Sequence, residues 1–266
     1  MAYIIEYWSD KNIRAKQAKL HTEEMRRKYI NEILYSVNNT QIYRKDFRIE
    51  VSQRNETQTE IIVIDANTVE AISKWNVGKT AVLNFSSYKN AGGMFLNGSK
   101  AQEECLCHAS FLYNVLASYT QAFYEWNNQH KNKALYLNRA LYSPDIVFEY
   151  NESVFKCDVI TCAAPNKSAA QKYQNVSDDE NTKFLRERIK FVLKIAYDNN
   201  VETLILGAYG CGVFGQNPTE VATIFKEYLS TDFNRCFKNV IFAIPKSSTN
   251  NNYTAFENVF NVRKVK

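Results

Sequence analysis

Glycine and proline are scarce in this chain, with 8 glycines and 4 prolines in 266 residues. No low-complexity linker or internal repeat is visible, so each glycine cluster is informative. The six cysteines include no Cys-x-x-Cys pair, which favours reduced, buried thiols over disulfides or zinc. The sequence has no N-terminal signal pattern and no apolar run of membrane-spanning length. We therefore expect a cytoplasmic protein without a membrane partner.

The overall composition is that of an ordinary globular protein. Hydrophobic residues make up 45% and charged residues 23%, a balance that argues against wholesale disorder. The length suits one sizeable core with a small extension. The net charge of +5, from 33 basic and 28 acidic residues, suits a polyanionic ligand without identifying one. The basic residues are too dispersed to form a nucleic-acid stripe.

Apolar periodicity predicts strands that alternate with helices, which is typical of an α/β domain with a parallel or mixed sheet. A polar, charged helix is expected first, packed as an accessory element on the main domain. Expected helices cover residues 10–37, 66–75, 99–119, 178–197 and 219–229. Expected strands cover residues 47–51, 60–64, 80–85, 140–142, 154–162, 203–206 and 240–244.

A glycine loop follows the apolar run 80–85, in the segment TAVLNFSSYKNAGGMFLNGSKAQEECL. Open α/β sheets bind ligands at the carboxyl ends of their strands. Gly92 and Gly93 lack side chains, so their backbone can approach a phosphate or ribose closely. Ser99 is predicted to cap the next helix, with Gln102 at its third position as in a capping box.

Two carboxylates, Glu103 and Glu104, fall in the first turn of that helix. Their positions diverge by about 100° around the helix axis, so we expect different roles for them. Acidic residues are also common in first turns because they complement the helix dipole. The combination of a strand, a glycine pair and Gln-Glu-Glu at a ligand-binding edge favours a functional reading.

A second glycine loop lies far along the chain, in the segment TLILGAYGCGVFGQNP at residues 203–218. Such a loop presents several amides to one point, and the following helix N-terminus adds positive potential, as a diphosphate requires. A Rossmann loop would follow the first strand of its domain, and a Walker loop would carry Gly-Lys-Ser/Thr. The four glycines of this loop are Gly207, Gly210, Gly212 and Gly215.

Together these segments resemble the bacterial-type poly(ADP-ribose) glycohydrolases, a macrodomain family. The resemblance covers residues 46–266 and implies a macrodomain-like three-layer α/β/α fold with a mixed sheet, preceded by a helical accessory segment at residues 1–45. The family's Gly-Gly-Gly and Gln-Glu-Glu signatures match Gly92, Gly93, Met94, Gln102, Glu103 and Glu104. Its phosphate loop, G-A-x-G-C-G-x-F, matches Gly207, Ala208, Gly210, Cys211, Gly212 and Phe214. Met94 departs from the third glycine of the signature and puts efficiency and substrate identity in question.

The resemblance also implies roles for individual residues. Glu104 would protonate the leaving ribose hydroxyl and then activate water, while Glu103 would bind ribose hydroxyls. Gly210, Cys211, Gly212 and Val213 would wrap the diphosphate, with Phe214 beside the distal ribose or adenine. Asp65 is a candidate for the adenine amino group or a simple cap, and Asn90 for ribose hydroxyls or loop structure. No cofactor or metal is expected, since the three histidines show no metal-ligand spacing.

The expected activity is poly(ADP-ribose) glycohydrolysis that releases ADP-ribose in an exo manner. The alternatives are hydrolysis of mono-ADP-ribosylated substrates on the same fold and a non-catalytic ADP-ribose reader. Readers need the phosphate loop but not the paired glutamates, so the glutamates favour an enzyme. The expected partners are ADP-ribose or its polymer on modified proteins or nucleic acid, and a monomer is favoured.

Overall fold

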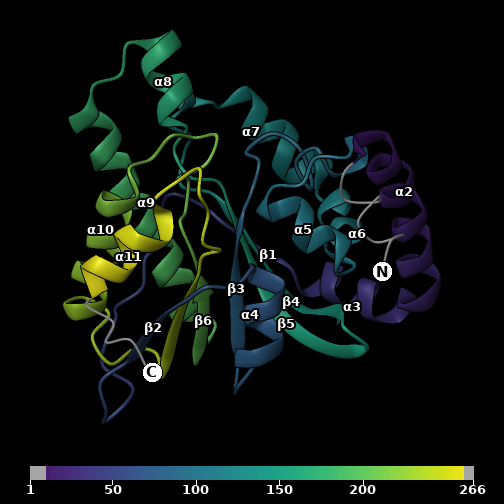
Figure 1. Cartoon of the computed structure of the whole chain (residues 1–266), viewed down its shortest axis with the longest axis horizontal. Helices are drawn as coiled ribbons and strands as arrows, with labels where there is room; N and C mark the ends of the chain where they lie inside the picture. Colours follow the sequence, from purple (N-terminus) through teal and green to yellow (C-terminus); the bar gives the residue numbers. More distant parts are fainter. Residues whose placement is uncertain (1–9, 261–266) are drawn as a thin grey trace.

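The computed structural model describes residues 10–260, and this part of the chain folds around one seven-stranded mixed sheet (Figure 1). The strand order is β1-β4-β5-β3-β6-β7-β2. β1 and β4 run antiparallel to their neighbours, whereas β5, β3, β6, β7 and β2 are mutually parallel. The strands are β1 Gln41–Tyr43, β2 Glu60–Ile64, β3 Thr80–Phe85, β4 Ala140–Tyr150, β5 Ser153–Cys162, β6 Thr203–Leu206 and β7 Asn239–Ala243.

Helices cover both faces of the sheet and complete the expected three layers (Figure 1). α9, α10 and α11 pack on one face, and α4, α5 and α6 on the other, with α2 and α3 outside them. No helix of residues 10–260 combines the length and apolarity needed to cross a bilayer. The helices are α2 Lys11–Lys28, α3 Ile30–Asn39, α4 Thr68–Trp75, α5 Gln102–His108, α6 Leu112–Ser118, α7 Trp126–Gln129, α8 Lys167–Gln174, α9 Asp178–Asp198, α10 Pro218–Ser230 and α11 Asn252–Phe260.

The two central strands bring both glycine segments to one edge. β3 and β6 are hydrogen-bonded neighbours, and both are almost wholly buried because helices cover each face. They run parallel, so the loops that follow them emerge at the same end of the sheet. The sequence separates these loops by more than a hundred residues, and the topology reunites them.

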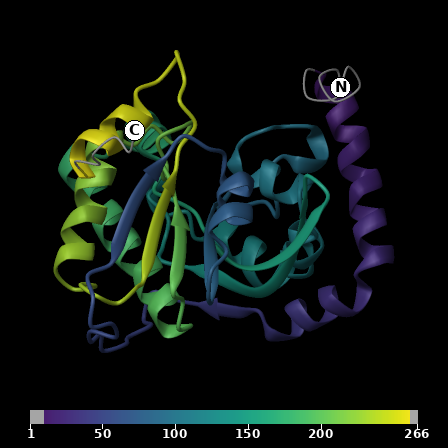
Figure 2. The same cartoon turned by 60° about the horizontal axis from the view of Figure 1, so that its bottom comes forward.

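The predicted helix at 10–37 is two helices, α2 and α3, separated at Tyr29. Tyr29 leaves helical geometry at φ −125°, and its hydroxyl donates to Glu149 on β4 at 2.5 Å. α2 runs along the outside of the molecule (Figure 2). The domain boundary at residues 45/46 stays a prediction, and β1, which precedes it, is a strand of the main sheet. Residues 1–9 and 261–266 of the two predicted segments lie outside the described chain.

The predicted strand at residues 47–51 was wrong. Its apolar residues Phe47, Ile49 and Val51 are partly buried against the core on the α9 side, but the backbone pairs with no strand. Phe47 packs edge-on against Tyr43, with 4.8 Å between ring centroids. Alternating burial thus arises here from packing on a helical layer rather than from a sheet ladder.

The capping role predicted for Ser99 was also wrong. The helix begins at Gln102, after Ala101, with no side-chain cap. The Ser99 amide instead donates to the Met94 carbonyl at 3.2 Å, which keeps Ser99 inside a tight turn. The helix also ends earlier than predicted, at His108, because the chain turns at Ser110 to bridge β4 before α6 begins.

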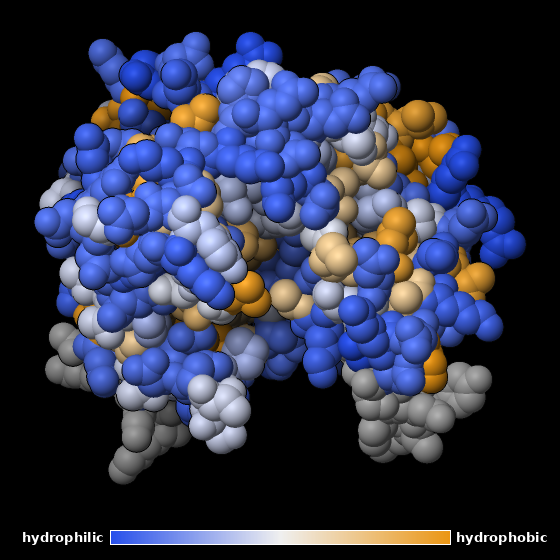
Figure 3. Space-filling view, turned by 90° about the horizontal axis from the view of Figure 1, so that it is seen from above, coloured by the Kyte–Doolittle hydropathy of each residue, from blue (hydrophilic) through white to orange (hydrophobic). Residues whose placement is uncertain are grey.

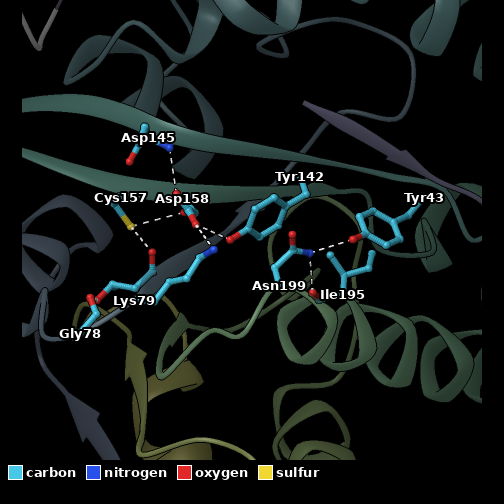
Figure 4. Close-up of polar contacts among 10 residues, drawn as sticks. Tyr43, Gly78, Lys79, Tyr142, Asp145, Cys157, Asp158, Ile195 and Asn199 are labelled. Atoms are coloured by element: carbon cyan, nitrogen blue, oxygen red, sulfur yellow. Dashed lines mark hydrogen bonds and ion pairs between the residues drawn. The ribbon is translucent and has the colours of Figure 1, made fainter. Parts of the chain in front are cut away.

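A buried polar cluster lies beside the start of β3, at the end of the sheet opposite the glycine loops (Figure 4). Asp158 on β5 accepts hydrogen bonds from the Tyr142 hydroxyl and, at 2.8 Å, from the Asp145 amide. Asp145 has φ +56° in a bulge of β4. Lys79 lies 3.8 Å from the same carboxylate. These contacts commit Asp158 to fixing the bulge, far from the edge that carries the glycine loops.

Candidate active site

A cavity of about 500 Å³ opens at the edge where β3 and β6 end. Seen from above, the molecule is hollowed near the middle of this face (Figure 3). Both glycine loops contribute to the wall, so the two segments converge as the sequence predicted. The predicted site residues that line the cavity are Gly93, Met94, Gln102, Glu103, Glu104, Gly210, Gly212, Val213 and Phe214.

Glu103 is a buried carboxyl held by two donors. Its Oε2 accepts from the Ser87 amide at 2.7 Å, and its Oε1 accepts from the Asn84 side chain at 3.2 Å. Asn84 therefore helps to fix the position of the Glu103 carboxyl group. Burial, opposed by these hydrogen bonds and reinforced by Glu104, raises the pKa of Glu103 from 4.5 to about 8. At neutral pH this carboxyl carries a proton for most of the time.

Glu104 is also buried, but within residues 10–260 only one of its two carboxyl oxygens has a hydrogen-bond partner. Its Oε1 accepts from the Met94 amide at 2.9 Å. Its Oε2 is buried and has no hydrogen-bond partner among residues 10–260, although Glu104 lines the cavity. A buried polar atom without a partner is uncommon in native structures and needs a reason. A ligand hydroxyl in the cavity would supply the missing partner.

Gly92 and Gly93 of the first loop cannot be replaced by a larger residue without a steric clash, and the clash differs between them. Both have positive φ, +64° for Gly92 and +63° for Gly93. A Cβ on Gly93 would lie 2.6 Å from Oε1 of Glu104 and 2.9 Å from Oε2 of Glu103, so both carboxylates meet at this residue. A Cβ on Gly92 would instead lie 2.7 Å from the Tyr113 ring, which does not line the cavity. The missing side chain of Gly93 therefore leaves room for the two carboxylates, and that of Gly92 leaves room for the Tyr113 ring.

Gln102 joins helix α5 to the end of β3. Its Oε1 accepts from the Phe85 amide at 2.8 Å, and its Nε2 donates to the Leu83 carbonyl at 2.9 Å. Both ends of the amide are thus engaged by backbone. These two hydrogen bonds fix the start of α5 against β3, and therefore also the position of the two glutamates that follow Gln102.

The second loop carries unpartnered backbone amides in residues that line the cavity. Gly212, Val213 and Phe214 line it, and their backbone N–H groups donate to no residue within the described chain. A Cβ on Gly212 would meet nothing within 4 Å. The Cys211 amide differs, because it donates to the Ala208 carbonyl at 3.1 Å inside the loop. Three consecutive free amides suit an anionic group such as a diphosphate.

Four predicted ligand residues lie outside the cavity lining: Gly92 and Cys211, described above within their loops, and Asn90 and Asp65. Asn90 is exposed, its amide donates to the Ser87 hydroxyl, and its carbonyl accepts from the Gly93 amide at 3.1 Å. Asp65 follows β2, at the far edge of the sheet, where it accepts from the Lys246 amide at 2.8 Å. Ligand contacts of Asn90 and Asp65 stay predictions.

Sequence reasoning missed an aromatic wall beside the phosphate loop. Tyr88 and Tyr136 stack with ring centroids 4.2 Å apart, and Phe214 meets Tyr136 edge-on at 6.1 Å. All three line the cavity. Phe214 was identified from the sequence, but the two tyrosines lie in segments without a recognisable motif. A stacked aromatic wall suits a planar base or the apolar face of a sugar.

A buried arginine holds this wall in place. The Arg188 guanidinium on α9 donates to the Tyr136 carbonyl at 3.1 Å, to Asn138 Oδ1 at 2.6 Å and to the Ala163 carbonyl. The loop that Arg188 binds, at residues 134–138, has positive φ at Ala134 (+64°) and Tyr136 (+61°). Such conformations cost energy for non-glycine residues. The sequence offered one missed signal, a lone arginine on the apolar face of a predicted helix.

Among residues 10–260, no group of three His, Cys, Asp or Glu side chains is arranged to hold a metal ion. His108, one turn after Glu104, packs its ring edge-on against Phe95 with centroids 4.6 Å apart. Burial lowers the pKa of His108 to about 4, so it is neutral at physiological pH. It thus contributes to packing between α5 and the loop before it.

Comparison with known proteins agrees with this geometry. The family model for the microbial-type PARG catalytic domain matches residues 12–149. The structure of poly(ADP-ribose) glycohydrolase from Thermomonospora curvata is 27% identical, with a TM-score of 0.87 over 94% of this chain and 100% of that chain. The same enzyme bound to the inhibitor ADP-HPD is also 27% identical, with a TM-score of 0.82 over 93% and 99% of the two chains.

The enzyme from Deinococcus radiodurans in complex with ADP-ribose is 30% identical, with a TM-score of 0.80 over 86% of this chain and 96% of that chain. A search of curated proteins finds no match. The family match covers just over half of the chain and includes both glutamates and the first glycine loop. The chain therefore belongs to the microbial-type poly(ADP-ribose) glycohydrolase family.

Proposed function

We propose that this protein hydrolyses the ribose–ribose bonds of poly(ADP-ribose), with Glu104 as the acid that protonates the leaving group. The observation that carries the assignment is the buried, unpartnered Oε2 of Glu104, in the same cavity as three free amides of the phosphate loop. In the related structures, the Deinococcus radiodurans enzyme is in complex with ADP-ribose and the Thermomonospora curvata enzyme with ADP-HPD. An acid and an anion cradle that share one cavity suit such a ligand.

The reaction requires a proton at the leaving oxygen and stabilisation of an oxocarbenium-like ribose. In the protonated state, Glu104 donates its proton through Oε2 to the leaving ribose hydroxyl oxygen as the bond to the anomeric carbon breaks. The resulting carboxylate then takes a proton from the attacking water, which restores the acid. The hydrogen bond from the Met94 amide to Oε1 fixes the orientation of the carboxyl group throughout.

Glu103 has a binding role in this proposal. Its two oxygens accept from Ser87 and Asn84, so its carboxyl plane is fixed before substrate arrives. Because its pKa is raised to about 8, it adds little negative charge at neutral pH and can offer an O–H donor to a ribose hydroxyl. The substrate's own diphosphate, bound by the loop amides, would supply the negative charge that the oxocarbenium ion needs.

Three further assignments belong to the proposal. The phosphate loop binds the diphosphate through Gly212, Val213 and Phe214, with Gly210 and Cys211 shaping the loop. The aromatic wall accommodates the distal ribose or adenine. Cleavage is exo, releasing ADP-ribose from a polymer end, and the polymer is carried by modified proteins or nucleic acid. The protein works as a cytoplasmic monomer without a metal or cofactor.

The test is Glu104→Gln, which keeps the shape of the side chain and its contact with the Met94 amide but removes the acid. We expect release of ADP-ribose from defined polymer to fall by at least about 100-fold, in line with loss of general acid catalysis. ADP-ribose affinity, measured by calorimetry, should stay within a few-fold of the wild type. Turnover equal to that of the wild type would remove Glu104 from the acid role. A parallel assay with mono-ADP-ribosylated protein distinguishes the two substrate classes.

A further inference from the structure

The N-terminal helix α2 lies against the turn that positions Glu104. It runs along the outside of the molecule, beyond the layer that contains α5 and α6 (Figures 1 and 2). Asp10 caps it by accepting from the amides of Asn12 and Ile13 at 2.7 and 3.0 Å. Its inner side buries Ala18 and Met25 completely or nearly so. The helix is thus docked firmly, although nothing in the proposed chemistry uses it.

The contact between α2 and the turn is made by backbone. Gly98 ends the short 3-10 turn Phe95–Asn97 with φ +75°. A Cβ on Gly98 would lie 2.0 Å from the Lys11 carbonyl oxygen and 3.0 Å from the Ala15 amide. Helix and turn therefore approach as closely as two backbones can, and only glycine fits between them.

Arg14 fixes this contact from the helix side. Its side chain is buried, and its Nε donates to the Gly98 carbonyl at 2.7 Å. A charged donor on a buried carbonyl forms one of the stronger hydrogen bonds in proteins. Arg14 thus holds one end of the turn at a defined distance from α2.

The other end of the turn holds Glu104. The amides of Asn97 and Ser99 both donate to the Met94 carbonyl, at 3.0 and 3.2 Å, so the turn moves as one unit. Met94 in turn donates its own amide to Oε1 of Glu104. Phe95, buried beneath the turn, packs against His108 of α5 and His21 of α2. A continuous set of contacts therefore runs from Arg14 to the catalytic carboxyl.

We propose that α2 is a positioning element of the active site and that Arg14 is its positioning residue, holding the Met94 amide where it orients Glu104. The inference rests on the proposed function of Glu104 and extends it to a helix that precedes the sheet. Because the contact set ends at Glu104 rather than at the phosphate loop, its loss should lower kcat and leave ADP-ribose binding almost unchanged.

The experiment compares Arg14→Met, which keeps much of the side-chain length but has no donor, with the conservative Arg14→Lys. The matched control is Lys16→Met, at an exposed position of the same helix. We expect kcat on polymer to fall about tenfold or more in Arg14→Met, partial recovery in Arg14→Lys, and wild-type kcat in Lys16→Met. KM for polymer and the Kd of ADP-ribose should stay within about twofold in all three variants.

A second variant disrupts the same contact between α2 and the turn, but by a change in the turn. Gly98→Ala drives a methyl group into the Lys11 carbonyl and should reproduce the kcat loss even if Arg14→Met folds poorly. Its control is Gly78→Ala, at φ +66° just before the start of β3, which has the same backbone strain but brings the added Cβ against Glu202 instead of α2. Hydrogen exchange at the Met94 amide should accelerate in Gly98→Ala and Arg14→Met only.

The outcomes separate this proposal from the one on which it rests. If the wild type does not cleave polymer, the proposed function fails and the role of α2 falls with it. If the wild type cleaves and Arg14→Met and Gly98→Ala keep at least half of its kcat, α2 has no positioning role. Equal losses of kcat and ADP-ribose affinity in these folded variants would also overturn the inference, because they would indicate a general structural effect.

Discussion

Gly93→Ala adds a single methyl group directly beside both buried glutamates, so it tests how closely activity depends on their position. The added Cβ would lie 2.6 Å from Oε1 of Glu104, whereas ordinary contacts begin at 3.4 Å, so the carboxylate must move by about 0.8 Å. Glu103 is approached as well, at 2.9 Å. A misplacement of about 1 Å at a reacting group can cost about 100-fold in rate. The backbone itself adds about 1–2 kcal/mol, because φ is +63°.

The two costs can be separated with Gly78→Ala. Gly78 has φ +66°, and its added Cβ would lie 2.7 Å from Oε2 of Glu202, so the backbone conformation and the type of collision are the same. The Glu202 side chain is 39% exposed and can turn toward solvent. Gly78→Ala should therefore lose about 1–2 kcal/mol of unfolding free energy and keep its activity.

The assay combines urea unfolding with release of ADP-ribose from defined polymer. Both variants should show a similar loss of stability, and only Gly93→Ala should lose kcat, by about 100-fold. The reasoning would be refuted if Gly93→Ala, folded at assay temperature, turned over within threefold of Gly78→Ala. The same holds if Gly78→Ala lost activity to the same extent, since strain alone would then explain both.

Two further predictions concern the other loop and the other carboxyl. Gly212→Ala should leave unfolding free energy unchanged, because its Cβ meets nothing within 4 Å, yet weaken ADP-ribose binding measured by calorimetry; wild-type affinity would contradict a diphosphate at this position. Glu103 keeps its proton up to about pH 8 when folded and loses it near 4.5 when unfolded, so its contribution to stability should decline as pH rises from about 4.5 to 8. In urea titrations Glu103→Gln should flatten this decline, by up to a few kcal/mol; an unchanged pH slope would count against the raised pKa of Glu103.

Local sequence signals predicted most of the fold and both loops of the site. β3 was predicted with its observed bounds, because a strand covered on both faces reads as an uninterrupted apolar run. Ser99 shows where such signals fail. It follows a glycine turn, and its amide bonds to that turn at Met94, while the helix begins only after Ala101. The phosphate loop was found because four of the chain's few glycines gather in it.

The missed parts of the site depend on tertiary contacts without a local pattern. Tyr88 and Tyr136 stack where Arg188, on a helix behind the sheet, binds the Tyr136 carbonyl. The position of Gly98 against α2 likewise depends on how two distant segments dock. Composition and periodicity do not encode such contacts. Sequence reasoning therefore found residues that line the cavity more readily than the residues that hold them in position.

The strand order also has a consequence for how the protein is made. β3 lies between β5 and β6, and β2 at the sheet edge pairs with β7, which comes near the end of the chain. A ribosome that has released residues up to Cys162 has therefore delivered both glutamates while β3 still lacks one neighbour and β2 has none. An interrupted product of this length would contain Glu103 and Glu104 but not the second glycine loop, and would expose apolar strand edges as a target for proteases.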